Sequence, residues 1–323
     1  MPSFSDAVTA YRICANAEGK SPATVTWVCD AVRYFRAFLG EGVDVEAVTA
    51  DDLRRFIAAL REKRSFSTHR LTPTQDRTLS TETVANYVRG VKTFYSALER
   101  EEFIDHNPVK KVKIPKTPRK TMPAFKEEEV VRLLRQPDRR TYRGYRDFVV
   151  MLTLLDTCLR ISELCGLRLD DVDLTNGYLR VMGKGARERY VPVGAKVSKE
   201  LLKYRVAWRP ADAMSDSFFL TTDGRPLSKK RVQDGIRRYG REAGIRTRCS
   251  PHTFRSTGAV LYLRHGGDVF TLQRKLGHTT LAMTRRYAEV ADSDVRAAHL
   301  PPADAVTARR TRCPPSRPRI VKG

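Results

Sequence analysis

The chain has 323 residues, with 60 lysines and arginines against 37 aspartates and glutamates, a formal net charge of +23 at pH 7. This length allows about two domains, and a content of 41% hydrophobic residues argues against a wholly disordered chain. The longest nearly apolar run, residues 148–155, is far shorter than the roughly 20 residues that cross a bilayer, and no signal peptide is visible, so we expect neither a transmembrane nor a secreted protein.

The positive charge is the strongest feature of the composition. A surplus of this size predicts a polyanionic partner, with nucleic acid as the first candidate and an anionic membrane surface as the second. Charge by itself does not separate DNA from RNA, or an enzyme from a binding protein.

The six cysteines are scattered and none forms a C-x-x-C pair. They predict reduced thiols in a cytosolic protein, without a zinc site.

The first 108 residues are predicted to be helical. Ser21 with the proline after it, Thr49 with the aspartate three residues later, and Ser80 are each typical of a helix N-terminus. Each is followed by apolar residues three and four positions apart. Residues 61–79 are polar and basic and predict a long loop. An Asn-Pro pair ends this part, because the residue before a proline avoids the helical conformation.

A basic segment with two prolines follows over residues 109–122, and it is predicted to be a semi-rigid linker. A solvated connector and a connector that also contacts DNA phosphates both remain open, and the second is at least as well supported in so basic a chain. The candidate DNA-binding residues of this linker are Lys110, Lys111, Lys113, Lys116, Arg119 and Lys120.

The second part, residues 123–300, is predicted to be mainly helical with a small β-sheet. Strands are expected at 178–182 and 189–193, as a hairpin around a Gly-Lys-Gly turn. Helices are expected over 126–136, 145–155, 198–208, 228–243 and 250–265. Residues 301–323 are rich in proline and arginine, and we expect a disordered basic tail.

Three short stretches combine arginine, histidine and tyrosine beside glycines. They read T-C-L-R-I-S-E-L from Thr157, P-H-T-F-R from Pro251, and L-G-H from Leu276, with Tyr287 nine residues after the histidine. Each alone has an ordinary explanation, such as an ion pair between Arg160 and Glu163 or a half-buried tyrosine.

Together the stretches resemble the tyrosine recombinases, the phage integrase family. The family's first box is typically T-G-x-R-x-x-E-L, and here a cysteine replaces the glycine. Its hairpin motif G-K-G-x-K-x-R-x-V-P corresponds to residues 183–192, with Arg187 in place of the second lysine. The H-x-x-R, the L-G-H and the tyrosine follow in the family's order and local spacing.

The resemblance implies a helical, SAM-like core-binding domain over 1–108 and a catalytic domain over 123–300, which form a C-shaped clamp on double-stranded DNA. It implies that the enzyme cuts and rejoins DNA through a 3′-phosphotyrosine, without metal, ATP or another cofactor. The catalytic residues that it implies are Arg160, Lys184, His252, Arg255, His278 and the nucleophile Tyr287, with Glu163 in support.

The resemblance gives these residues distinct roles. The two arginines bind the nonbridging phosphate oxygens, and Lys184 protonates the leaving oxygen. His252 assists proton transfer at the tyrosine, and His278 hydrogen-bonds the phosphate.

The resemblance also implies an assembly. We expect a homotetramer on two DNA sites, a mainly monomeric free protein, and a place in the bacterial cytoplasm on the nucleoid. A helix over 292–300 either docks on a neighbouring protomer or packs on its own domain. Nothing resembling an arm-binding domain precedes the helical part, which favours short core sites like those of chromosome-dimer resolution, plasmids or mobile elements.

Three rival functions remain open. One is a type IB topoisomerase-like enzyme, which shares the chemistry but acts on a single duplex. Another is a catalytically silent relative that only binds DNA, against which the complete set of reacting residues argues. A metal-dependent nuclease or transposase is weaker, because no carboxylate cluster stands out.

Overall fold

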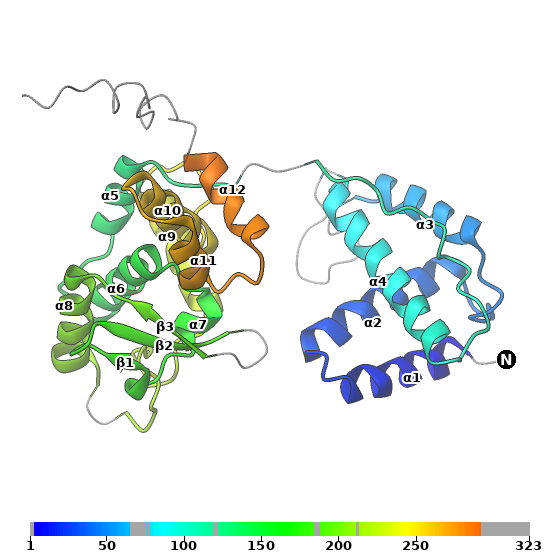
Figure 1. Cartoon of the computed structure of the whole chain (residues 1–323), viewed down its shortest axis with the longest axis horizontal. Coiled ribbons are helices and arrows are strands. Elements are labelled where there is room, and N and C mark those ends of the chain that lie inside the picture. The colour runs from blue at the N-terminus through cyan, green and yellow to red at the C-terminus, as the bar shows by residue number, and fades with distance from the viewer. Residues whose placement is uncertain are drawn as a thin grey trace, which may run out of the picture. The chain divides into compact units, whose positions relative to one another are not determined.

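The computed structural model describes residues 3–64, 76, 78–118, 122–183, 188–210 and 213–291. The chain divides into two compact units, Met1–Lys120 and Thr121–Gly323. Helices dominate both units, and the second also holds a small antiparallel sheet (Figure 1). The predicted fold class, mainly helical with a small sheet, is therefore confirmed. Among the described residues, no helix is long and apolar enough to cross a membrane.

The first unit has four helices in its described part: α1 (Phe4–Ala17), α2 (Pro22–Leu39), α3 (Ala50–Glu62) and α4 (Thr81–Arg100). The last three begin directly after the predicted N-caps Ser21, Thr49 and Ser80, whose hydroxyls accept the backbone N–H three residues on. The sequence analysis did not identify α1. Helix α2 packs against α4 (Figure 1), and the aromatic residues Phe35 and Phe94 are fully buried in the shared core.

The first residues of the predicted linker belong to the first unit in the structure and do not form a free connection. Val109 and Val112 are 0% and 4% exposed and belong to the core of the first unit. The ammonium of Lys92 on α4 donates to the carbonyls of Val109 at 3.2 Å and Lys110 at 2.8 Å, and also to that of Val112. Burial lowers the pKa of Lys92. Because two valines alternate with the lysines, this segment packs on the first unit instead of beginning a free connection.

The lysines of this segment project outward where they are described. Lys110, Lys111, Lys113 and Lys116 are exposed, and Lys110 forms an ion pair of 3.3 Å with Glu99. The remaining two predicted DNA-binding cations, Arg119 and Lys120, lie outside the described residues, as does most of the predicted loop 61–79.

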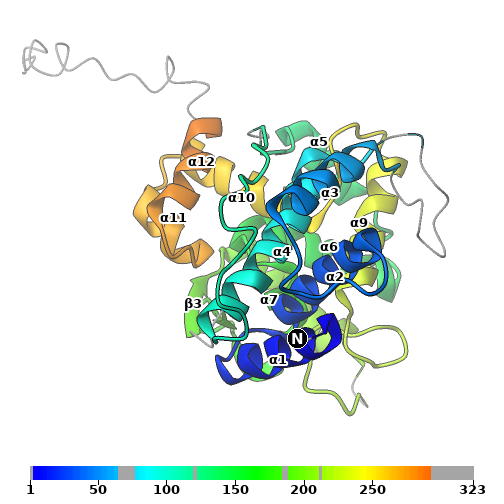
Figure 2. The ribbon, with the colours of Figure 1, turned by 90° about the vertical axis from the view of Figure 1, so that its right-hand side faces the viewer.

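At the centre of the second unit lies α6 (Tyr142–Thr157), which is buried along most of its length. The other helices described there are α5 (Glu127–Arg135), α7 (Ile161–Cys165), α8 (Ala195–Lys203), α9 (Lys229–Glu242), α10 (Pro251–Arg264), α11 (Val269–Leu276) and α12 (Leu281–Ala291). Helices α10 and α8 pack on α6, and α11 and α12 lie side by side (Figure 2). The predicted helix 198–208 is split, because α8 is followed by a wider π turn over Tyr204–Trp208.

The sheet has the strand order β1-β2-β3 and is antiparallel throughout, with β1 (Val172–Asp173), β2 (Tyr178–Met182) and β3 (Glu188–Pro192). Leu179 and Val181 of β2 and Val191 of β3 point into the core, and the alternate residues face outward. The predicted hairpin is therefore present, with its second strand one residue earlier than expected. Its turn, which contains Lys184, lies outside the described residues.

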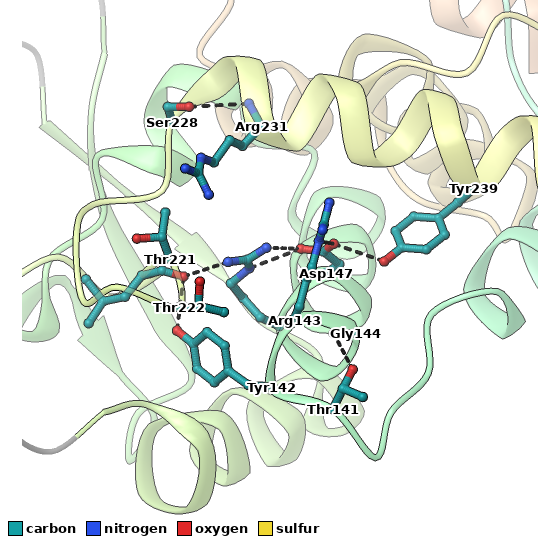
Figure 3. A network of polar contacts seen from close by, with 12 residues as sticks. Thr141, Tyr142, Arg143, Gly144, Asp147, Thr221, Thr222, Ser228, Arg231 and Tyr239 are labelled. Atoms are coloured by element: carbon teal, nitrogen blue, oxygen red, sulfur yellow. Dashed lines mark hydrogen bonds and ion pairs between the residues drawn. The ribbon is translucent and has the colours of Figure 1, made fainter.

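A polar network lies between α6, α9 and the loop before α9 (Figure 3). Arg146 is 4% exposed, and its Nε and Nη2 donate to Asp147 Oδ1 at 3.0 and 2.6 Å. Its Nη1 donates to the Leu220 carbonyl at 3.0 Å, and the Tyr239 hydroxyl donates to Asp147 Oδ2 at 3.0 Å. Asp147 is therefore the carboxylate that balances a buried guanidinium.

Replacing Asp147 with alanine should destabilise the second unit by about 3 kcal/mol, because it leaves the Arg146 charge buried and uncompensated. Unfolding in urea should be followed in a Trp27→Phe background. The remaining tryptophan, Trp208, stacks on Tyr145 of α6 at 4.9 Å and so reports on this unit alone. As a control, Asp234→Ala removes an exposed carboxylate of α9 and should change stability little. Equal effects of the two substitutions would contradict the role of Asp147.

Candidate active site

The site begins where α6 ends and the chain reverses. Cys158 occupies the position of the family's usual glycine, and it has a φ of 54°. This left-handed conformation explains why glycine suits the position. The turn points the Cys158 carbonyl toward Arg255, and Arg160 follows as the N-cap of α7. Burial raises the pKa of the Cys158 thiol to about 11, so this cysteine is an unreactive packing group.

Glu163 on α7 is bonded to two arginines. Arg160 donates its backbone N–H to Oε2 at 2.8 Å and its Nη1 to Oε1 at 2.9 Å. Arg189 on β3 donates to the same two oxygens at 3.0 and 2.9 Å. Burial raises the pKa of Glu163, but the hydrogen bonds from Arg189 and Arg160 outweigh it, so the pKa is lowered overall. The carboxylate is therefore charged and fixed in place.

Arg255 on α10 is buried, with 4% of its surface exposed. Nη1 donates to the Cys158 carbonyl at 2.6 Å, and Nη2 donates to the Leu276 carbonyl at 2.8 Å. Burial and the charge of Arg160 lower the pKa of this guanidinium. Among the described residues, no carboxylate forms an ion pair with it. A buried cation held only by neutral groups favours the binding of an anion.

His278 lies beside Arg255, just after the C-terminus of α11. Its Nε2 is 3.4 Å from Nη2 of Arg255, and its Nδ1 is 3.0 Å from the buried hydroxyl of Thr284. Gly277, with a φ of 61°, ends α11 and turns the histidine into the site. Burial and the nearby arginines lower the pKa of His278 to about 4, so its imidazole is neutral at neutral pH.

The depressed pKa of His278 predicts how stability depends on pH. Between the ordinary histidine value and about 4, the unfolded chain binds a proton that the folded chain does not. The contribution of His278 to stability is therefore lost as the pH falls through this window. Urea unfolding from pH 7 to pH 4.5 should show a smaller loss of stability in His278→Gln than in the wild type. Identical pH profiles would contradict the burial of a neutral imidazole.

Tyr287 lies on α12, which packs against α10 and α11. It is 3% exposed and belongs to a small apolar cluster with Cys158 and Leu276. Its ring stacks on that of His278, with centroids 5.9 Å apart and an angle of 20° between the planes. Thr284, which contacts His278, precedes it by one helical turn. Helix α12 thus places Tyr287 against His278, which in turn lies beside the buried Arg255.

His252 is exposed in the first turn of α10, one turn before Arg255 on the same helix. Ser250 caps this helix, and its hydroxyl accepts the Thr253 N–H at 3.2 Å. Burial of part of the ring lowers the pKa of His252, and the charges of Arg255 and Arg248 lower it further. A proton-accepting imidazole is thus available beside the arginines at neutral pH.

The structure joins five of the predicted site residues in two groups, Arg160 with Glu163 and Arg255 with His278 and Tyr287. Gly277, whose carbonyl lies 3.5 Å from Nη2 of Arg160, directly precedes His278 and connects the two groups. His252 is near them and exposed, and Lys184 lies outside the described residues. Sequence reasoning missed Arg189 and Thr284. Arg189 is the arginine of the hairpin motif, and its place in that motif was the available signal. Thr284 lies three residues before Tyr287 on one helix face.

The site combines three guanidiniums with one carboxylate and neutral imidazoles. Its net positive charge and planar donors suit a phosphate group, to which arginine can donate two parallel hydrogen bonds. Among the described residues, no group of three or more histidine, cysteine, aspartate or glutamate side chains is placed to hold a metal ion.

Comparison with known proteins finds consistent similarity. The sequence profile of the Phage integrase family matches residues 123–294. The chain is 33% identical to tyrosine recombinase XerD of Staphylococcus aureus (strain Mu50 / ATCC 700699) over 224 residues, which cover 68% of this chain and 76% of the relative.

Two solved structures share the fold. The XerH site-specific recombinase bound to a palindromic difH substrate in a post-cleavage complex has a TM-score of 0.69 and 18% identity, over 89% of this chain and 82% of that chain. A lambda integrase tetramer bound to a Holliday junction has a TM-score of 0.66 and 16% identity, over 87% and 78%.

Proposed function

The chain belongs to the phage integrase family of tyrosine recombinases, and we propose that it cuts and rejoins duplex DNA through a 3′-phosphotyrosine on Tyr287. Site-specific DNA recombination is the activity of this family. The observation that carries the proposed mechanism is the buried guanidinium of Arg255, which has no carboxylate partner among the described residues and is linked through His278 to the tyrosine ring.

The proposed reaction exchanges one phosphoester bond for another. The Tyr287 oxygen attacks the phosphorus, and the bond from phosphorus to the 5′ oxygen breaks. The tyrosine loses its proton with the help of His252, and the leaving oxygen receives one from Lys184. Since the number of ester bonds is unchanged, the reverse attack by a 5′ hydroxyl rejoins the strand without ATP.

The arginines act on the charge of the transition state. Negative charge develops on the nonbridging oxygens, and donors already fixed in place stabilise it without reorganisation. Arg255 is held by two backbone carbonyls, and Arg160 is held by Glu163 with 37% of its side chain exposed. His278 adds a hydrogen bond to the phosphate.

We extend the proposal to the assembly. Exchange between two duplexes cuts four strands, so four tyrosines act in a homotetramer on two sites, and the lambda integrase neighbour is a tetramer on a Holliday junction. The first unit and the exposed lysines at its end bind DNA, as does the catalytic unit. Self-repulsion at +23 keeps the free protein mainly monomeric. The enzyme works in the bacterial cytoplasm on nucleoid DNA.

A trapping experiment tests the proposed chemistry. Random duplexes are first selected for binding to the full-length Tyr287→Phe protein, which identifies a site without cleavage. The selected site is then synthesised with a nick next to the cleavage position. After the attack, the short fragment that carries the new 5′ hydroxyl diffuses away, so it cannot rejoin the strand. We expect wild-type protein to form an adduct stable to denaturing electrophoresis, with the DNA mapped to the Tyr287 peptide by mass spectrometry.

The alternatives give different outcomes in the same assay. A silent DNA-binding relative selects a site but forms no adduct. A topoisomerase-like enzyme relaxes supercoiled plasmids without the selected site, and it forms no recombinant product from two sites. An adduct on a residue other than Tyr287 would refute the assignment.

A further inference from the structure

Arg189 on β3 touches the site at two separate places. Its side chain is 15% exposed, and its two terminal nitrogens donate to both oxygens of Glu163. Its third nitrogen, Nε, donates to the Lys275 carbonyl in the last turn of α11 at 3.2 Å. One planar side chain therefore connects α7 with the end of α11.

The first contact determines how Arg160 is held. A carboxylate offers about four positions for hydrogen bonds, and Glu163 receives four: two from Arg189, one from the Arg160 backbone and one from Arg160 Nη1. Because Arg189 takes half of these positions, Arg160 is bound through a single side-chain nitrogen. Its Nη2 lies at 3.5 Å from the Gly277 carbonyl, a long contact, and 37% of the side chain is exposed.

Without Arg189, two of the four hydrogen-bond positions of Glu163 would lose their donors. Glu163 is only 4% exposed in its side chain, so water replaces the lost donors poorly. The carboxylate would attract a second nitrogen of Arg160 and form the bidentate pair that arginine and carboxylate prefer. The guanidinium edge that faces the phosphate would then be lost or turned away.

The second contact determines where His278 lies. Arg189 holds the Lys275 carbonyl, and its guanidinium packs against Gly277, where a Cβ would lie only 3.1 Å from Cζ of Arg189. Gly277 directly precedes His278, and its carbonyl also lies 3.5 Å from Nη2 of Arg160. The same side chain therefore fixes the spacing between Arg160 and the histidine.

We propose that Arg189 is a positioning residue of this active site, which keeps one edge of Arg160 free for the phosphate and holds the turn that carries His278. The proposal rests on the proposed function, in which Arg160 and His278 bind the phosphate that Tyr287 attacks. Arg189 itself acts through these two residues and through Glu163.

The test measures cleavage apart from DNA binding, in the full chain and on the nicked selected site. Arg189→Met removes the donors at similar length, and Arg189→Lys keeps the charge but not the fork. We expect Arg189→Met to lower the rate of adduct formation at saturating DNA by about 100-fold, the effect of misplacing a reacting group by about 1 Å. The Kd for DNA should stay within about twofold of the wild-type value, since Arg189 supplies only one of the many positive charges that attract the phosphates. Arg189→Lys should retain part of the rate.

A double-mutant cycle separates positioning from a general structural effect. If Arg189 acts through Arg160, adding Arg189→Met to Arg160→Lys should lower the rate far less than the product of the two single losses. The control is Arg180→Met on the neighbouring strand, where an outward arginine pairs with Asp171 at 2.9 Å, and it should cleave at the wild-type rate.

The outcomes are distinct. An Arg189→Met protein as fast as the wild type, or losses that multiply in the double variant, would overturn the positioning role. If Arg189→Met is unstable in urea unfolding, the rate of adduct formation and the double-mutant cycle are measured with Arg189→Lys instead. A wild-type protein that forms no adduct on Tyr287 would overturn the proposed function instead.

Discussion

Replacing Tyr287 with phenylalanine should abolish the covalent protein–DNA adduct and leave folding and DNA binding intact. Among the described residues, the Tyr287 hydroxyl makes no hydrogen bond, and its ring packs with the apolar cluster and on His278. Phenylalanine keeps these ring contacts, so stability should change little. Loss of a nucleophile commonly costs on the order of 10⁶-fold in rate, which lies below the detection limit of a gel assay.

The matched control for this variant is Tyr262→Phe. Tyr262 lies on α10 and packs on the same apolar cluster, but it is not part of the set linked to Arg255. Its variant should form the adduct at the wild-type rate. Both proteins should bind the selected site with the Kd of the wild type. Residual adduct in Tyr287→Phe, or equal loss in both variants, would show that Tyr287 is not the nucleophile.

Replacing Arg255 with lysine should slow cleavage by about 10²- to 10³-fold, the cost of losing a preorganised donor to developing negative charge. The substitution keeps a positive charge, but an ammonium does not reproduce the planar contacts with the carbonyls of Cys158 and Leu276 together with a free edge toward the phosphate. The rate of adduct formation should be measured in single turnover at saturating DNA. Arg160→Lys should show a loss of similar size.

Arg264→Lys is the control for these variants, because Arg264 is an exposed arginine in the last turn of the same helix α10. It should leave the rate unchanged. Urea unfolding and the Kd for DNA should be measured for all variants, since a folding defect would lower every activity together. Wild-type cleavage rates in both Arg160→Lys and Arg255→Lys would refute the proposal that these arginines bind the phosphate.

Local sequence determined the starts of several helices and indicated the candidate site residues. Ser21, Thr49 and Ser80 predicted helix starts correctly, because the hydroxyl of an N-cap accepts a backbone N–H only three residues away. The Gly-Lys-Gly sequence between two short segments likewise predicted a hairpin, and its first strand corresponds to β2. The family motifs were read directly from spacing along the chain.

Tertiary structure alone decided which partners hold those side chains. Arg255 is held by carbonyls 97 and 21 positions away, and Arg189 reaches Glu163 across 26 positions. Val109 and Val112 are part of the first core, and Lys92 binds their carbonyls, although their segment has the composition of a linker. Such contacts depend on how α6, α10, α11 and β3 pack, and a motif records which side chains are present but not the carbonyl or carboxylate that each one meets. The sequence therefore indicated the chemistry proposed for this protein, whereas packing determined which carbonyls and carboxylate hold each arginine.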